Sequence, residues 1–243
     1  PVTGRRLWGL IKKELRIYFN SPVAYMIILF FILAASSHLF FIQQFFARDT
    51  ASLKSYFGLF PLLYSFVIPA ITMGTFAEER RLGTEELLLT LPVTEVELVA
   101  GKYIASFILV LLMIILTLPV PWTITPLGEF DSGELLGEYT GLVLLGSMGL
   151  SFGIFVSVLS KHQISAFIAG VSGLLGLTFL RRITVFLKLP EAVSRHIRYF
   201  TLQYRFESFT RGVVDTRDVV FFLLVSFLFL YGAVKVLVFR KWR

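Results

Sequence analysis

Long runs of apolar residues alternate with short polar segments along the whole chain. A membrane span needs about 20 mostly apolar residues, and we expect six such spans, at residues 23–46, 56–77, 95–120, 139–159, 164–180 and 218–239. Because spans and modest loops use up the chain, little is left for a separate soluble domain. The pattern therefore predicts an all-α integral membrane protein with one transmembrane domain over residues 1–243.

The first 21 residues follow a different pattern, in which apolar residues recur with helical spacing and basic residues occupy the opposite face. A basic amphipathic helix with a tryptophan suits the plane of a membrane surface. We therefore expect residues 1–21 to form an interfacial helix in contact with lipid, with Trp8, Lys12, Lys13 and Arg16 among its interfacial residues. Ser21 as an N-cap and Pro22 at the first helical position predict that a new helix starts there, with spans one to five in residues 22–180.

The positions of charged residues predict the orientation of the spans. Lys and Arg flank the ends that six spans would place together, which predicts a cytoplasmic location for both chain termini. The loop before the fourth span is acidic and lacks Lys and Arg, which favours the outer side; it holds Glu129, Asp131, Glu134 and Glu138. Residues 181–217 are too polar for a span, and we expect short helices there at the outer surface. Residues 218–243 then supply the sixth span and a basic tail.

The most densely charged short segment lies between the second and third spans. We expect span two to continue as far as Leu82, Gly83 to end it in a left-handed conformation, and Thr84 to cap a new short helix. Pro92 ends that helix, and Thr94 with Glu97 forms a capping box for span three. The short helix carries Glu85, Glu86, Leu87, Leu88, Leu89 and Leu91. Its leucines predict docking into a groove of another protein, with the acidic residues setting the register.

Composition narrows the class of function. The chain is 56% hydrophobic and 16% charged, whereas soluble domains are about 25% charged. We attribute the net charge of +7 to basic flanks at a membrane rather than to nucleic-acid binding. Without cysteine there is no disulfide or thiolate metal site, and we expect no metal or cofactor in this chain. The absence of a phosphate-binding motif predicts that energy comes from a partner or an ion gradient.

The charged segment also carries a family resemblance. The run Phe76-x-Glu78-Glu79-x-x-x-Gly83-Thr84-x-Glu86-x-Leu88-Leu89-x-x-Pro92-Val93, followed by Gly101-Lys102, resembles the signature of ABC-2-type transporter permeases. Two further runs are similar to the gliding-motility-associated branch, a relative of the permease for nitrous-oxide-reductase maturation. These are Lys12-Lys13-Glu14-Leu15-Arg16 with Phe19-x-Ser21-Pro22-x-Ala24-Tyr25, and Phe206-Glu207-Ser208-Phe209 with Arg211-Gly212-Val213-Val214-Asp215-x-Arg217-Asp218.

The resemblance implies a membrane permease in the bacterial inner membrane that contains no catalytic residue. It implies a dimer with a second copy or a related permease, and two separate ABC ATPase subunits that bind ATP and Mg. The helix from Thr84 to Leu91 would be the coupling helix, and residues 181–217 would hold re-entrant helices. We expect Glu78, Glu79, Arg80 and Arg81 to form supporting ion pairs with the neighbouring chain or the ATPase. The output would be export, or force delivered to an outer-side (periplasmic) accessory protein.

Two other interpretations compete with a permease. Gly149-Leu150-Ser151-Phe152-Gly153 matches the G-x-S-x-G pattern of serine hydrolases but lies within a span. Its glycines fit close helix packing better. Gly170 and Gly173 of span five have the same explanation, and a subunit interface is one place where such packing would occur. An ion-coupled secondary transporter or channel is the main alternative, but such proteins place ionisable residues at mid-membrane depth. The sequence shows Lys235 as the only clear internal charge, near the end of the last span.

The predicted orientation is tested by labelling single cysteines, since the chain has none of its own. A cysteine replacing Ser132 in the acidic region should react with a membrane-impermeant maleimide added from outside. One replacing Lys161, in the turn between spans four and five, should react only after the membrane is opened. The reverse pattern would invert the topology.

Overall fold

The structure, a computed structural model, describes residues 2–39, 53–84, 93–124, 131–186 and 201–241. Every regular element within these ranges is a helix. Four helical stretches within these ranges are long and apolar enough to cross a membrane: Glu95–Ile124, Ser132–Leu159, Gln163–Leu180 and Thr216–Lys241. A bent pair at the N-terminus gives a fifth candidate if its two helices form one span. The all-α membrane fold is therefore confirmed, and the number of six spans stays a prediction.

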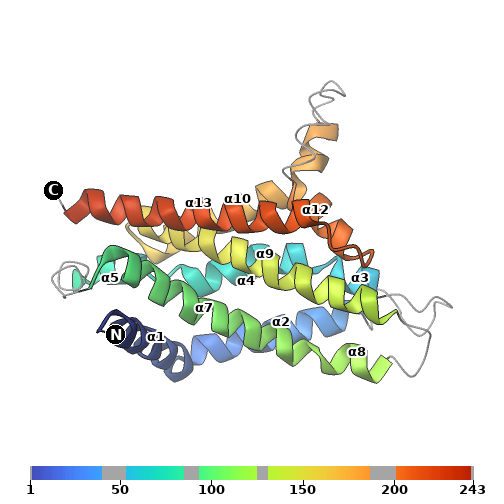
Figure 1. Cartoon of the computed structure of the whole chain (residues 1–243), viewed down its shortest axis with the longest axis horizontal. Helices are drawn as coiled ribbons and strands as arrows, with labels where there is room; N and C mark the ends of the chain where they lie inside the picture. Colours follow the sequence, from blue (N-terminus) through green and yellow to red (C-terminus); the bar gives the residue numbers. More distant parts are fainter. Residues whose placement is uncertain (1, 40–52, 85–92, 125–130, 187–200, 242–243) are drawn as a thin grey trace.

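Helix α9 (Ser132–Leu159) forms the centre of the bundle. It has the largest buried share of the four long apolar helices. Figure 1 shows α9 between α7 (Glu95–Thr117) and α13 (Thr216–Lys241). It also packs against α4 (Phe60–Thr72), α10 (Gln163–Phe186) and α12 (Leu202–Phe209). Helices far apart in sequence are thereby held around one axis.

Glycines allow the close approach of α4, α9 and α10. A Cβ atom at Gly149 of α9 would lie 2.6 Å from Cδ1 of Ile68, and one at Gly153 would collide with Thr72. On α10, a Cβ atom at Gly170 would lie 3.0 Å from Cβ of Pro69, and one at Gly173 would overlap the Phe152 ring. All four glycines therefore face neighbours within this chain, where a larger residue would push the helices apart.

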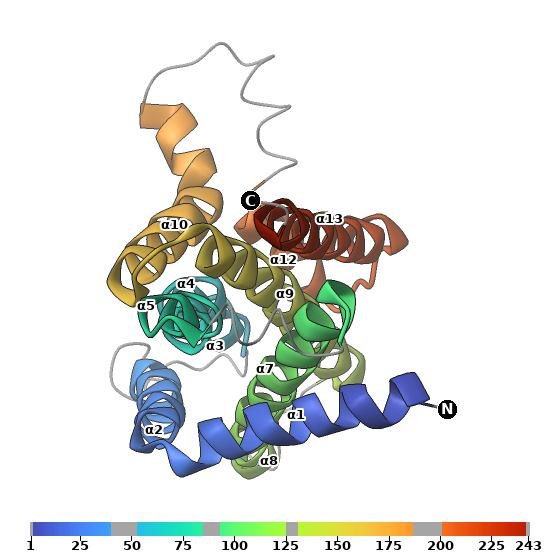
Figure 2. The same ribbon diagram turned by 90° about the vertical axis from the view of Figure 1, so that its left-hand side faces the viewer.

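The N-terminal helix lies across the bundle instead of along it. Helices α1 (Val2–Asn20) and α2 (Pro22–Ser37) meet at a 73° bend, and Figure 2 shows α1 crossing below α7. Ser21 caps α2 by accepting a hydrogen bond from the Val23 amide at 3.3 Å, and Pro22 opens the helix. The structure therefore has a helix over residues 2–20 and a restart at Ser21, as predicted, and the location of α1 at the membrane interface stays a prediction.

The second predicted span is not one continuous helix. It consists of α3 (Lys54–Phe57), α4 and α5 (Ala77–Arg81), with a turn between α4 and α5 at residues 73–76. The hydroxyl of Ser157 on α9 accepts hydrogen bonds from the amides of Phe76 and Ala77, at 3.2 and 3.3 Å. It also donates to the carbonyl of Met73 at 3.3 Å. The break persists because α9 supplies partners for backbone groups that a continuous helix would pair internally.

Two predicted boundaries near the acidic segment are also wrong. Asp131 caps α9 by accepting a hydrogen bond from the Gly133 amide at 2.8 Å, so Glu134 and Glu138 lie inside a helix rather than in a loop. Span three, predicted over residues 95–120, ends as α7 at Thr117, and the short helix α8 (Pro119–Ile124) follows it. In the region 181–217, α10 continues to Phe186 and α12 is a short helix as predicted; residues 187–200 lie outside the described residues.

We expect Ser157→Ala to lower the free energy of unfolding by about 1–3 kcal/mol, because two buried amides would lose their acceptor. Thermal unfolding in detergent would measure the loss. Ser165→Ala is the matched control, since the exposed Ser165 hydroxyl only donates to the nearby carbonyl of His162. Equal melting temperatures for the two variants would contradict the role given to Ser157.

Candidate functional site

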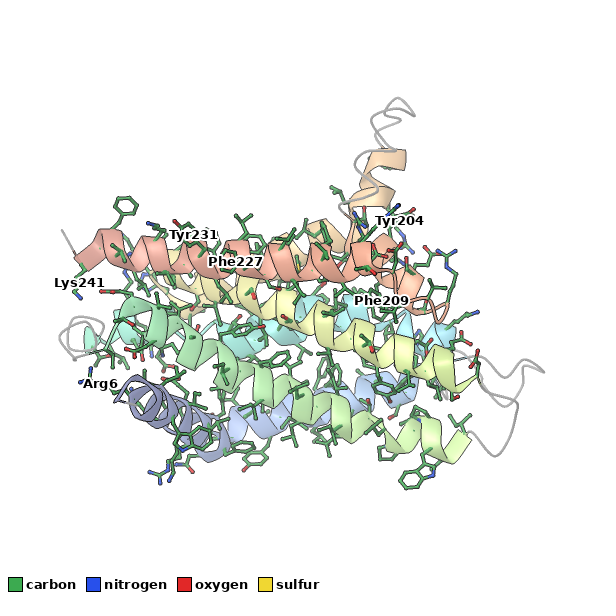
Figure 3. The ribbon with its side chains drawn as sticks, in the orientation of Figure 1. Arg6, Tyr204, Phe209, Phe227, Tyr231 and Lys241 are labelled. Atoms are coloured by element: carbon green, nitrogen blue, oxygen red, sulfur yellow. The ribbon has the colours of Figure 1, made fainter. Side chains whose placement is uncertain are left out.

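One end of the bundle gathers the elements on either side of residues 82–94. Helix α5 precedes this segment and α7 follows it, while α1 and the C-terminal end of α13 lie at the same end (Figure 1). Figure 3 places Arg6 and Lys241 there, and Tyr204 and Phe209 at the opposite end. We call this the α5 end. Any displacement of residues 82–94 would first reach α5 and α7.

Local sequence signals set both boundaries of this segment as predicted. Gly83 adopts a left-handed φ of 71° directly after α5, a conformation that glycine adopts without a Cβ clash. Thr94 opens α7 with a complete capping box: the Glu97 amide donates to the Thr94 hydroxyl at 3.2 Å, and the Thr94 amide donates to Glu97 Oε2 at 2.9 Å. Each such cap contributes about 1 kcal/mol, so the segment is joined to α5 and α7 at fixed points.

A buried ion cluster joins three helices at the α5 end. The ammonium of Lys102 on α7 donates to Oε1 of Glu14 on α1 at 3.1 Å and to Oε1 of Glu79 on α5 at 2.8 Å. It also lies 5.0 Å from the centre of the Phe76 ring. The Lys102 side chain is only 3% exposed. We call Glu14, Phe76, Glu79 and Lys102 the Lys102 cluster.

The Lys102 cluster holds two carboxylates for one ammonium. Burial raises the pKa of the Glu79 carboxyl, and the charge and hydrogen bond of Lys102 oppose that rise. Oε2 of Glu79 is buried and has no hydrogen-bond partner among the described residues. Removing one partner of a buried ion pair leaves the other charge uncompensated, which costs far more than the net gain from forming the pair. The ion pairs of Lys102 with Glu14 and Glu79 therefore stabilise one arrangement of α1, α5 and α7.

Neutral hydrogen bonds extend the joint between α1, α4 and α7. The Tyr18 hydroxyl on α1 shares a hydrogen bond of 2.9 Å with Ser106 on α7 and donates to the carbonyl of Ile71 on α4 at 3.3 Å. Where α1 crosses α7, a Cβ atom at Gly101 would lie 3.1 Å from Cβ of Leu10, so the helices nearly touch. The α1–α7 contact therefore combines close packing with buried polar bonds.

Three further polar contacts connect α5 and α7 to the other helices at the α5 end. Gln163 at the start of α10 donates to Oε2 of Glu78 at 3.0 Å, and Arg80 donates to the carbonyl of Ser160 at 3.3 Å. Lys241 at the end of α13 binds Glu95 at the start of α7, with 2.7 Å between Nζ and Oε1. Every element at the α5 end thus has at least one polar bond to a neighbour.

The structure places part of the site predicted from the sequence. Glu78 forms an exposed pair with Arg81 at 3.9 Å, and Glu79 has its cationic partner in the same chain. Thr84 is exposed, and its hydroxyl donates to the carbonyl of Glu79 at 3.1 Å. The other predicted docking residues lie outside the described residues: Glu85, Glu86, Leu87, Leu88, Leu89 and Leu91.

In the described part of the chain, Ser151 of the G-x-S-x-G run is not placed as a catalytic serine would be. The Ser151 side chain is fully buried, and its hydroxyl donates to the carbonyl of Ser147 within the same helix. No histidine is among its recorded partners in the described part of the chain, so Ser151 lacks the base that activates a serine nucleophile. This geometry favours the packing interpretation of the G-x-S-x-G run.

Sequence reasoning missed Glu14 and Lys102 as site residues, although both lie in motifs that carry the family resemblance. Lys102 follows seven residues after the start of an apolar helix, and an ionisable residue within a span calls for a named partner. Lys235, taken as the only clear internal charge, is exposed and lies over the Tyr231 ring. The internal charge that matters at this end is Lys102.

Comparison with known proteins gives one match. A family model described as "ABC-2 family transporter protein" matches residues 12–176, which is more than half of the chain. A search among curated proteins finds no match. The matched range contains every member of the Lys102 cluster and the whole segment between α5 and α7.

We expect Lys102→Met to lower stability by about 3–5 kcal/mol, because two carboxylates would remain buried without a cation. The triple variant Lys102→Met, Glu14→Gln, Glu79→Gln should recover most of this loss, since no uncompensated charge remains. Thermal unfolding in detergent would measure both variants. The control is Lys241→Met, which breaks the more exposed pair with Glu95 and should cost about 0–1 kcal/mol. A triple variant no more stable than Lys102→Met would contradict the argument.

Proposed function

The chain belongs to the ABC-2 family of transporter proteins and is a membrane permease, and we propose that it couples ATP hydrolysis in a separate ATP-binding subunit to export or to force transmission. The chain would supply the membrane path and the mechanical link. ATP and Mg would be bound by the partner subunit. This division of labour agrees with the lack of a nucleotide-binding motif in the chain.

The Lys102 cluster is the observation that carries the proposal. Residues 82–94 are joined to α5 and α7, and Lys102 binds Glu79 of α5 and Glu14 of α1 at hydrogen-bond distance. A partner that pushes on this segment would therefore move α5 and α7 without separating them. Through Glu14 the same displacement would reach α1, and through Tyr18 it would reach α4. The Lys102 cluster would thus make α1, α5 and α7 move together.

We place the ATPase contact on residues 84–91. Leu87, Leu88 and Leu91 would dominate the affinity, because exposed ion pairs contribute only about 0–1 kcal/mol. Since Glu79 is engaged by Lys102, the polar part of the contact would come from the exposed Glu78–Arg81 pair and from Glu85 and Glu86. Thr84 would mark the start of the docking segment.

The assembly that we propose holds two permeases and two ATPase subunits. The second permease is another copy of this chain or a related one, and each has six spans with both termini in the cytoplasm of a bacterial inner membrane. An outer-side accessory protein would receive the cargo or the force. Within the family, the motifs at residues 12–25 and 206–218 favour the gliding-motility-associated branch.

The docking proposal is tested by Leu88→Asp, which should reduce recovery of the ATPase subunit by at least tenfold when the complex is purified in mild detergent. A buried carboxylate in an apolar groove is unfavourable by several kcal/mol, whereas insertion of the permease in the membrane should be unchanged. Val213→Asp is the matched control, because Val213 is exposed at the opposite end of the bundle. Normal recovery of the ATPase with Leu88→Asp would refute the docking segment. An ion-coupled carrier would instead transport alone in liposomes.

A further inference from the structure

Helix α1 presents two faces with opposite chemistry. Ile11 and Glu14 are buried against the bundle, where Glu14 binds Lys102. On the other side Lys12, Lys13 and Arg16 are exposed. Residues three to four apart share a helix face. Lys12, Lys13 and Arg16 therefore form one patch on the face of α1 that also carries Gly9. We call these three cations the basic stripe.

The basic stripe surrounds a shallow depression of about 430 Å³. Its described lining residues include no acidic side chain and are Gly9, Lys12, Lys13, Arg16, Ile17 and Asn20. Lys12, Lys13 and Arg16 form no hydrogen bond or ion pair within the described part of the chain. A Cβ atom at Gly9 would meet nothing within 4 Å, so the floor of the depression is open. Three cations around one hollow are suited to an anion with several oxygen acceptors, although the charge of Lys13 also acts on Glu79.

The surroundings of the stripe indicate where that anion comes from. Trp8, one turn before Lys12, is 63% exposed, and Phe19 is 38% exposed. After the 73° bend, α2 turns an apolar surface outward, with Met26, Leu29, Phe30 and Leu33 all exposed. Exposed aromatic residues beside an apolar helix mark the boundary between the headgroups and the hydrocarbon of a bilayer. These surroundings are the ones expected of a stripe at the level of lipid phosphates.

We propose that the basic stripe of α1 is a binding site for the phosphate headgroups of anionic phospholipids. Lys and Arg beside a bilayer are attracted to anionic lipid by about fivefold in affinity for each charge. The proposal goes beyond the ATPase-coupled function and does not depend on it. It also connects lipid composition with the Lys102 cluster, since lipid bound at the stripe would hold the helix that carries Glu14.

The test uses Trp8 as a fluorescent reporter in the whole chain. Trp122→Phe and Trp242→Phe leave Trp8 as the only tryptophan, because the chain has three. The protein is placed in phosphatidylcholine nanodiscs that contain equal fractions of either brominated phosphatidylglycerol or brominated phosphatidylcholine. Enrichment of anionic lipid at the stripe should make brominated phosphatidylglycerol the stronger quencher of Trp8. The difference should shrink as salt is raised, because exposed charges are screened.

Two variants at one position separate charge from shape. Gly9→Glu places a carboxylate in the open depression and should weaken the preference for phosphatidylglycerol about fivefold, whereas Gly9→Gln has the same size without the charge and should keep it. The variant Lys12→Gln, Lys13→Gln, Arg16→Gln should remove the preference, a loss of about a hundredfold for three charges. The control Lys161→Gln, Arg211→Gln, Arg217→Gln removes three exposed cations elsewhere and should not change it.

Equal quenching of Trp8 by the two brominated lipids would overturn the proposal and leave the stripe as a contact for an acidic protein surface. An unchanged preference in the triple glutamine variant would also overturn it, because the stripe would then not be the source of selectivity. These measurements contain no ATPase. Failure of the lipid site and failure of the coupling function are therefore distinguishable.

Discussion

The ammonium of Lys102, buried within the first turns of an apolar helix, must be paired inside the protein, because isolated buried charges are too costly to persist. The partners come from two helices far away in sequence, Glu14 of α1 and Glu79 of α5. This requirement explains why α1 lies across α7 instead of continuing along α2. It also explains why α5 stays close to α7 although a turn separates it from α4. The architecture of the α5 end thus follows from one charge and its two partners.

The sequence allowed correct predictions where neighbouring residues decide the structure. The capping box of Thr94 and Glu97 and the left-handed Gly83 each depend on a few adjacent residues. The N-terminal amphipathic helix and the cap at Ser21 are local in the same sense. The long apolar helices follow from composition alone. These features define the ends of α1, α5 and α7, and so locate the candidate site without any tertiary information.

Predictions failed where a distant part of the chain supplies a partner. The break between α4 and α5 depends on the Ser157 hydroxyl, which lies about 80 residues away and satisfies the amides of Phe76 and Ala77. Nothing in the apolar run up to Ala77 indicates that a distant hydroxyl accepts hydrogen bonds from its amides. The start of α9 is a different case: Asp131, three residues before Glu134, is a helix-capping signal that the density of acidic residues obscured. Lys102 was overlooked because its position in the second turn resembles the ordinary basic flank of a span.

Helix α1 carries an anionic residue on its inner face and cationic residues on its outer face. Its inner face must carry an anion, since Glu14 shares the charge of Lys102, while the charged residues that line the depression on its outer face are all cations. Adjacent residues point about 100° apart on a helix, so Glu14 is buried and Lys13 is exposed although they are neighbours in sequence. A force on residues 82–94 that reaches Glu14 would therefore act on a helix whose other side, as we propose, binds anionic lipid. Under the two proposals, the membrane surface would provide the support against which α5 and α7 would move.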